Sequence, residues 1–176
     1  LDQTSFTCSD VGANTVTLTA SDGTNSSTAT ATVTVADTTR PIANAQDITV
    51  YLDGTGNATI TTSDIDNGSS DNCGTVTLSL DQTSFTCSDI GANTVTLTAT
   101  DGTNSSTASA TVTVADTTRP IANAQNITVY LDGSGNATIV AADIDNGSSD
   151  NCGTVTLSLD QTSFTCSDVG ANTVTL

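Results

Sequence analysis

The sequence predicts an all-β protein, and three observations carry that prediction. All 19 acidic residues are aspartate, which favours turns, and glutamate, which favours helices, is absent. Threonine and valine, which favour strands, alternate over long stretches between Asn-, Asp- and Gly-rich turns. The segment LDQTSFTCSD begins at Leu1 and returns at Leu80 and Leu159, so the chain repeats with a period of 79 residues.

The repeat predicts a tandem array of small domains. Residues 1–79 and 80–158 differ at eight positions, all by mild substitutions such as Val11/Ile90. This period is too long for a solenoid unit and suits a self-contained domain. Each period has one proline, in the segment ADTTRP at 36–41 and 115–120, where it favours a short, stiff linker. We therefore expect the end of one domain at 1–37, a complete domain at 38–116 and the start of a third at 117–176.

Alternation and turn signals predict six strands in the complete domain. The expected strands are 47–52, 57–62, 74–80, 83–87, 93–100 and 106–115. Val95, Leu97 and Ala99 should point inward, and DGTN at 101–104 should form a hairpin turn. Short antiparallel strands with this turn spacing favour an immunoglobulin-like β-sandwich with two sheets.

The five cysteines predict disulfides. The economical pairing joins Cys73 to Cys87 and Cys152 to Cys166, because a hairpin folded near residue 80 would set Cys73 opposite Cys87. The partner of Cys8 would then lie upstream of Leu1. The alternative pairing, Cys8 with Cys73, would cross the linker. Zinc is a competing explanation, but it needs about four ligands, and the chain has no histidine and no CxxC motif. Disulfides predict an extracellular or cell-surface location.

Composition argues against several functions. The formal net charge is −17 with only two basic residues, so we expect no nucleic-acid binding. No apolar run approaches the ~20 residues of a membrane-spanning helix. Without histidine or glutamate most hydrolytic sites cannot be built, and we expect no enzymatic activity.

Aspartate clusters predict calcium at the domain junctions. The segment DIDNGSSDNCG at 64–74, repeated at 143–153, brings carboxylates and a turn glycine together, as calcium loops do. In an immunoglobulin-like sandwich this loop and the last hairpin turn share a pole with the incoming linker. The alternative is that these residues only form turns, the role we assign to Asp53 and Asp81. The expected calcium ligands are Asp37, Asp64, Asp66, Asp71 and Asp101 at one junction and Asp116, Asp143, Asp145 and Asp150 at the next.

Several motifs together resemble the HYR (hyalin-repeat) family of immunoglobulin-like modules. They are Asp37 with Pro41, then ITV, DNGSSDNCG, FTCSDIGANTVTLTATD and ATVTVAD. The similarity spans the whole period and is greatest to tandem copies in large secreted or surface-bound bacterial proteins, notably of the Bacteroidota. Many HYR modules have Cys-Pro near their start, where this chain has Ala45 and Gln46, and a further cysteine near the last strand, which SSTASA lacks.

The resemblance implies an extracellular structural stalk or filament that serves adhesion or fibre formation. Its expected partners are neighbouring repeats and further copies of itself. A glycan- or surface-binding adhesin module and a spacer in a secreted enzyme are the alternatives. The DTT segments also resemble the O-glycan acceptor of Bacteroidota, which makes Thr38 and Thr117 candidate glycosylation sites.

Overall fold

A computed structural model describes residues 1–176, and the chain falls into two compact units. The first consists of Leu1–Thr49, Thr59–Ser84 and Ala92–Thr113, and the second of Val50–Ala58, Phe85–Gly91 and Val114–Leu176. Neither unit coincides with one sequence period. Each unit instead contains one ADTTRP segment together with residues that precede and follow it.

The first copy contributes a long hairpin. Strands β1 (Gly12–Ser21) and β2 (Ser26–Val35) pair antiparallel from Gly12 opposite Val35 to Ser21 opposite Ser26. The turn between them is closed by Asp22, whose Oδ1 accepts hydrogen bonds from the backbone N–H groups of Thr24 and Asn25. A short 3-10 helix, η1 (Cys8–Asp10), precedes the hairpin.

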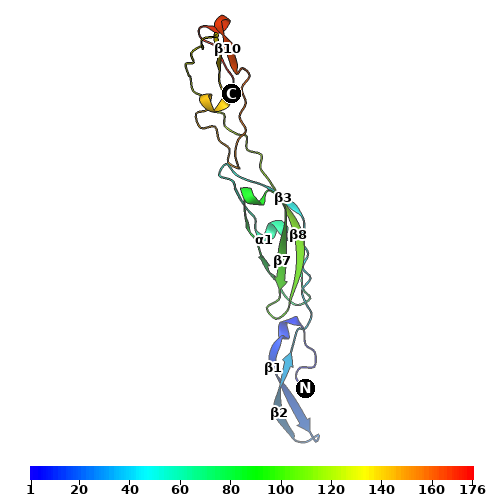
Figure 1. Ribbon diagram of the computed structural model, residues 1–176. Coiled ribbons are helices and arrows are strands. Elements are labelled where there is room, and N and C mark those ends of the chain that lie inside the picture. The colour runs from blue at the N-terminus through cyan, green and yellow to red at the C-terminus, as the bar shows by residue number, and fades with distance from the viewer. The chain divides into compact units, whose positions relative to one another are not determined.

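The central period forms a four-stranded sheet in the order β3-β8-β7-β5, with β7 and β8 as its long strands (Figure 1). The strands are β3 (Ile48–Tyr51), β5 (Thr77–Leu80), β7 (Gly91–Thr100) and β8 (Ser105–Ala115). Val95, Leu97 and Ala99 are all fully buried, as their alternation predicts, and the threonines between them are partly exposed.

A second pair, β4 (Asn57–Thr59) with β6 (Ser84–Thr86), stands outside that sheet. The predicted strand 57–62 stops early because residues 62–65 form the short helix α1 (Thr62–Ile65). Asp64 caps this helix: its Oδ2 accepts hydrogen bonds from the backbone N–H and the hydroxyl of Thr61, at 2.7 and 2.8 Å. After β6 the chain turns through η2 (Cys87–Asp89).

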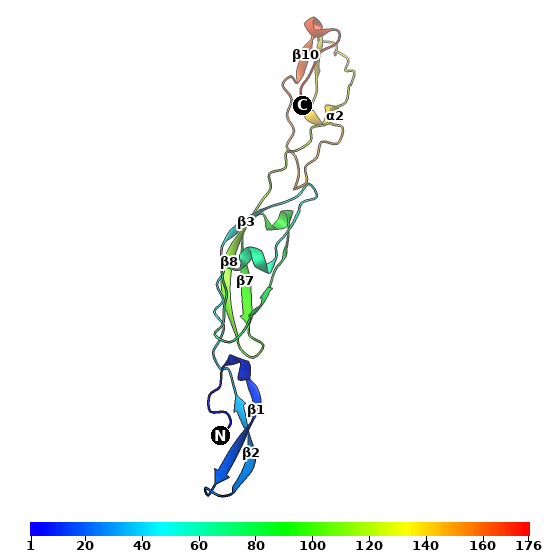
Figure 2. The same ribbon diagram turned by 180° about the vertical axis from the view of Figure 1, so that it is seen from behind.

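The third copy repeats several of these elements. Strands β9 (Asn136–Thr138) and β10 (Ser163–Thr165) correspond to β4 and β6, and α2 (Ala141–Ile144) corresponds to α1 (Figure 2). Helix η3 (Cys166–Asp168) corresponds to η1 and η2. Ile139, Ile144 and Phe164 form the core of this part of the chain.

The structure confirms the all-β prediction, since strands in sheets dominate and the helices are single turns. None of these helices is long and apolar enough to cross a membrane. The division into immunoglobulin-like domains at 37/38 and 116/117 stays a prediction.

Candidate functional site

The disulfides link residues on opposite sides of each ADTTRP segment. Cys8 is bonded to Cys73 and Cys87 to Cys152, each across 65 positions of sequence, with Cα–Cα distances of 5.0 and 5.3 Å. Cys166 is free and exposed. The predicted pairs Cys73–Cys87 and Cys152–Cys166 are therefore wrong, and the bonds follow the alternative that crosses the linker.

The strand pairing explains this correction. The prediction required residues 74–80 and 83–87 to form one hairpin. Instead, β5 pairs with β7, from Thr77 opposite Thr100 to Leu80 opposite Leu97, and β6 pairs with β4. The chain changes sheets between β5 and β6, so the two ends of the 73–87 segment do not meet.

A loop glycine makes room for the second disulfide. Gly56 is buried with φ +77°, and a Cβ at this position would lie 2.5 Å from Cys87 Sγ and 3.2 Å from the carbonyl oxygen of Asn151. L-residues with a side chain rarely adopt such a φ. Glycine is therefore required at position 56 for two reasons. The loop 53–57 has a positive φ there, and the Cys87 sulfur and the backbone of Asn151 in the next copy lie too close for a side chain.

Asn151 ties the same loop to the linker. Its side-chain amide donates to the Asp53 carbonyl oxygen at 3.0 Å and to Asp116 Oδ1 at 3.3 Å. Its carbonyl oxygen lies 3.3 Å from Cys87 Sγ. At the first junction Cys8 Sγ lies 3.3 Å from the Asn72 carbonyl oxygen, so the two disulfides recur in the same local setting.

The first linker is hydrogen-bonded to the hairpin turn of the following copy. The Asn104 side-chain amide donates to the carbonyl oxygens of Asp37 and Thr39, at 3.3 and 3.1 Å. The Ser106 hydroxyl donates to the carbonyl oxygen of Pro41, which is buried. The linker is thus held by side chains that lie some 65 residues later in the sequence.

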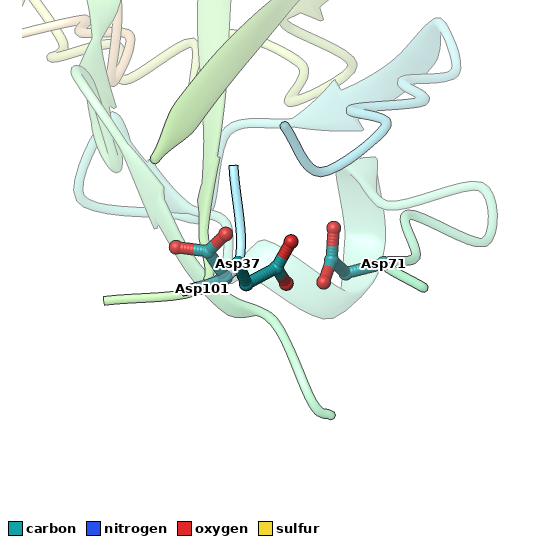
Figure 3. Close-up of side chains that lie close together, drawn as sticks. All are labelled: Asp37, Asp71 and Asp101. Carbon is teal, nitrogen blue, oxygen red and sulfur yellow. The ribbon is translucent and has the colours of Figure 1, made fainter. Parts of the chain in front are cut away.

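Three carboxylates converge beside this linker. Asp37, Asp71 and Asp101 each place one oxygen so that all three lie within 4.8 Å of one another, and all three residues are half-buried. Figure 3 shows the three side chains side by side, with Asp37 between Asp101 and Asp71 in this view. They come from the linker, the DNCG segment and the DGTN turn, three segments that the sequence predicted to meet.

Each carboxylate is oriented by backbone donors. One oxygen of Asp37 accepts from Thr39 N–H at 2.9 Å, and Asp71 Oδ2 accepts from Cys73 N–H at 2.9 Å. Asp101 Oδ1 accepts from two backbone N–H groups of its own turn, which lowers the pKa of Asp101 below its usual value, the larger cause being Asn104. Asp71 is thereby fixed two residues from the disulfide cysteine.

The other oxygen of Asp71 has no partner. Asp71 Oδ1 is buried without a hydrogen bond, and so is Asp150 Oδ1 one period later. Buried polar atoms are almost always partnered, and a buried anionic oxygen is costly to leave alone. The same oxygen is orphaned in both copies, so the feature belongs to the repeat.

The donor set fits a hard cation. Calcium binds oxygen ligands at 2.3–2.6 Å, so two ligand oxygens on one ion lie at most about 5 Å apart. The separation within the group of Asp37, Asp71 and Asp101 meets this condition. Zinc prefers nitrogen and sulfur ligands, and no free sulfur belongs to the group.

The other predicted ligands do not join the group. The carboxylates of Asp64 and Asp143 cap α1 and α2, where each accepts a backbone N–H. Asp66 and Asp145 close the following turns by accepting from Ser69 and Ser148 N–H. Hydrogen bonds from Ser69, its side chain first, lower the pKa of Asp66. The DIDNG half of the segment is therefore occupied locally, and only its second half contributes to the group.

At the second junction two of the three equivalent carboxylates are present. Asp116 Oδ1 accepts from Thr118 N–H at 3.0 Å, and Asp150 Oδ2 accepts from Cys152 N–H at 3.1 Å. The Thr118 N–H is the main cause that lowers the pKa of Asp116. The sequence stops before the position equivalent to Asp101.

Asp53 acts in a turn, as predicted: its Oδ1 accepts from the N–H groups of Thr55 and Asn57. Asp81 follows β5, and its Oδ1 accepts from the N–H of Thr96 in the neighbouring strand β7. The candidate acceptors Thr38 and Thr117 are exposed, and their glycosylation stays a prediction.

Sequence reasoning missed Gly56 and Asn104 as residues of the junction, and it gave the bond from Cys8 to Cys73 only as the alternative pairing. The bond had a signal in the sequence. The spacing of 65 residues between Cys8 and Cys73 recurs between Cys87 and Cys152, so it supports the alternative pairing as regularly as the spacing of 14 supports the predicted one. The glycine and the asparagine carried no signal distinct from that of ordinary turn residues.

Comparisons with known proteins give little further guidance. No protein-family model and no curated protein matches the chain. Among solved structures it is similar to the endo-fucoidan hydrolase MfFcnA4 of glycoside hydrolase family 107 and to a variant of that enzyme, at 25% and 26% identity over 63% of this chain. The chain spans about one fifth of their length, and the TM-scores are 0.30, too low to carry an argument about fold or activity.

Proposed function

We propose that this chain is part of an extracellular stalk or filament of tandem immunoglobulin-like domains, cross-linked at each junction by a disulfide and stiffened there by calcium. The observation that carries the proposal is the pairing of the cysteines, because both disulfides span an ADTTRP segment. A bond inside a domain would stabilise that domain alone. A bond across a linker joins one domain to the next, which suits a protein whose role is to hold its shape.

The pairing also creates a short covalent path along the array. From Cys8 the path crosses to Cys73, follows the chain to Cys87, and crosses to Cys152. Residues 9–72 and 88–151 lie in closed loops beside this path. When the ends are pulled, only the segment 73–87 can be drawn out in each period, about 50 Å of extended chain instead of about 280 Å for the whole repeat. The disulfides would limit extension.

The bonds also stabilise the folded repeats. Closing a loop of this length is worth about 4 kcal/mol in the chain-entropy estimate, more than the shorter loop of the predicted pairing would give. Such help matters in a domain of 79 residues with few large apolar side chains. Disulfides are compatible with an oxidising environment outside the cytoplasm.

Calcium would reinforce the same junction. A cation bound by Asp37, Asp71 and Asp101 would tie the linker to two loops of the next copy and would give the buried Asp71 Oδ1 a partner. It would also relieve the repulsion among three carboxylates in a chain of strong negative charge.

The proposal is tested on the producing cells. Antibodies raised against the 176-residue chain are applied to intact and to permeabilised cells, and the label is located by electron microscopy. We expect label on appendages or on the surface of intact cells. Label that appears only after permeabilisation would contradict an extracellular stalk.

A further inference from the structure

The outer face of the four-stranded sheet is covered by hydroxyl side chains. Along β7 the buried Val95 and Leu97 alternate with Thr94, Thr96 and Thr98, which point to the other side of the sheet. The outward positions of β8 from 105 to 113 are likewise all serine or threonine. The core therefore closes the inner face of this sheet, while the outer face offers hydroxyl groups to solvent.

The hydroxyls form continuous rows across the strands. Ser79 of β5 lies opposite Thr98 of β7. The turn of the β7–β8 hairpin is closed by the same backbone hydrogen bond as the turn of the β1–β2 hairpin, at 3.2 Å in both. In the first hairpin Thr19 lies opposite Thr28. One period later the equivalent pair is Thr98 with Thr107, and with Ser79 the two form one such row.

Carboxylates flank this face but do not lie within it. The chain has 19 aspartates, two arginines and a net charge of −17, yet the four strands of the sheet contain no charged residue. Asp47 precedes β3, and its Oδ1 accepts from Thr111 N–H at 2.6 Å. Asp81 follows β5, and its Oδ1 accepts from Thr96 N–H at 2.8 Å. These hydrogen bonds hold both carboxylates at the margins of the sheet.

We propose that this hydroxyl face, the outward side of β5, β7 and β8, binds the same face of a second copy of the chain. A hydroxyl group both donates and accepts hydrogen bonds, so a face of hydroxyls is complementary to itself, whereas a carboxylate only accepts. Two chains of net charge −17 repel each other least where no carboxylate stands between them. The inference goes beyond the proposed stalk and does not depend on its disulfides or its calcium.

The side chains of the face favour another sheet over a sugar. The strands β5, β7 and β8 contain no aromatic residue on which the apolar side of a sugar ring would pack. Sheets pack face to face about 10 Å apart with interdigitating side chains. Serine and threonine are short enough for this approach, and each threonine adds a methyl group to the contact.

The size of the face predicts a weak contact. With strands about 4.8 Å apart and about 3.4 Å per residue along each strand, the sheet covers about 500 Å². A stable interface buries about 800 Å² on each partner. One pair of faces is therefore too small for a tight dimer, and tandem copies that engage together would add to the strength of association.

The test measures self-association of the 176-residue chain by sedimentation equilibrium, from micromolar to millimolar concentration. Chelator is present, so that calcium does not bridge two chains, and the exposed Cys166 is alkylated, so that no disulfide joins them. We expect the apparent mass to rise from 17.5 kDa towards twice that value as the concentration increases. Added salt should strengthen the association, because it screens the repulsion between the two anionic chains.

Charges placed within the face should decide whether it makes the contact. Thr107→Asp brings like charges together and should lower the association constant about tenfold. Thr59→Asp is the matched control, because it adds the same charge at an exposed threonine of β4, outside this sheet, and should leave the constant unchanged. Thr107→Lys should also associate poorly alone. An equimolar mixture of Thr107→Lys and Thr107→Asp should associate at least as well as the wild type, which also shows that both variants are folded.

A mass of 17.5 kDa at every concentration would overturn the inference. So would equal association of the wild type and Thr107→Asp, because the contact would then lie elsewhere on the chain. Sedimentation with insoluble cellulose, a neutral polysaccharide, tests the other occupant. If the wild type stays monomeric but binds cellulose and Thr107→Asp does not, the face binds sugar and the inference is wrong.

Discussion

Cys87 is bonded to Cys152, which lies beyond the linker, and not to Cys73, which lies 14 residues before it. The same relationship holds one period earlier between Cys8 and Cys73. Successive copies are thus covalently joined twice, once by the peptide chain and once by a disulfide. This second connection is the basis of the predictions that follow.

Replacing Cys87 should release a thiol in the following copy. In Cys87→Ala we expect Cys152 to become free while Cys73 stays bonded to Cys8, and the loss of the cross-link should lower stability by about 2–5 kcal/mol. Thiols are alkylated in denaturant without reductant and located by peptide mapping. A free Cys73 in this variant would show that the bonds lie within the repeat.

Gly56→Ala should destabilise the second junction. The added Cβ would lie 2.5 Å from Cys87 Sγ in a backbone conformation unfavourable for alanine, and we expect a loss of about 1–3 kcal/mol in chemical unfolding. Gly54→Ala is the matched control, since nothing lies near its Cβ position. Equal losses in the two variants would mean that the disulfide does not pack against Gly56.

Calcium should stabilise the chain through Asp101. A ligand at ten times its dissociation constant adds about 1.4 kcal/mol to the folded state, so the melting temperature should rise by a few degrees over the chelated protein. Asp101→Asn should remove this rise. Melting curves recorded with calcium and with chelator measure it.

The repeat offers a matched control for that variant. Asp22 occupies the same hairpin turn one period earlier and accepts the same two backbone hydrogen bonds, but it does not belong to the carboxylate group. Asp22→Asn should therefore keep the calcium effect. An equal calcium shift in wild type and in Asp101→Asn would exclude the site.

Acid should weaken the fold. Backbone N–H donors are the main cause that lowers the pKa of Asp64 and of Asp81 from the usual 3.8. The pKa of these carboxylates is lower in the folded chain, so as the pH falls they take up protons in the unfolded chain first. They therefore contribute stability above about pH 4, and this contribution is lost as the pH falls through the folded-state pKa. Asp64→Asn should show a shallower acid dependence.

Urea midpoints between pH 6 and pH 2 measure this effect. We expect a plateau above about pH 5 and a decline below pH 4. A midpoint that rises as the solution is acidified would mean that relief of repulsion among the negative charges outweighs the lost hydrogen bonds.

Local patterns predicted the strands well, because alternation follows directly from the burial of one face of a sheet. The buried row Val95, Leu97 and Ala99 is an example. The end of the second predicted strand could not be read in the same way. The residues 61–64 are all polar and do not mark where the strand stops, whereas in the structure Asp64 caps a helical turn there.

Contacts between distant segments were predicted less well. The meeting of Asp37, Asp71 and Asp101 followed from the expected poles of a sandwich, whereas the choice of cysteine partners depended on which strand pairs with β5. Sequence spacing does not determine that choice. Asp64 and Asp66 looked equivalent to Asp71, but local hydrogen bonds to Thr61 and Ser69 engage them first.

The most direct test of the covalent path is to stretch single molecules held by tags at Leu1 and Leu176. With the disulfides intact, only residues 1–8, 73–87 and 152–176 lie in the path, and the fully extended length should be about 160 Å. Reduction should increase it to about 610 Å. A length of about 510 Å before reduction, the value for bonds Cys73–Cys87 and Cys152–Cys166, would contradict the account.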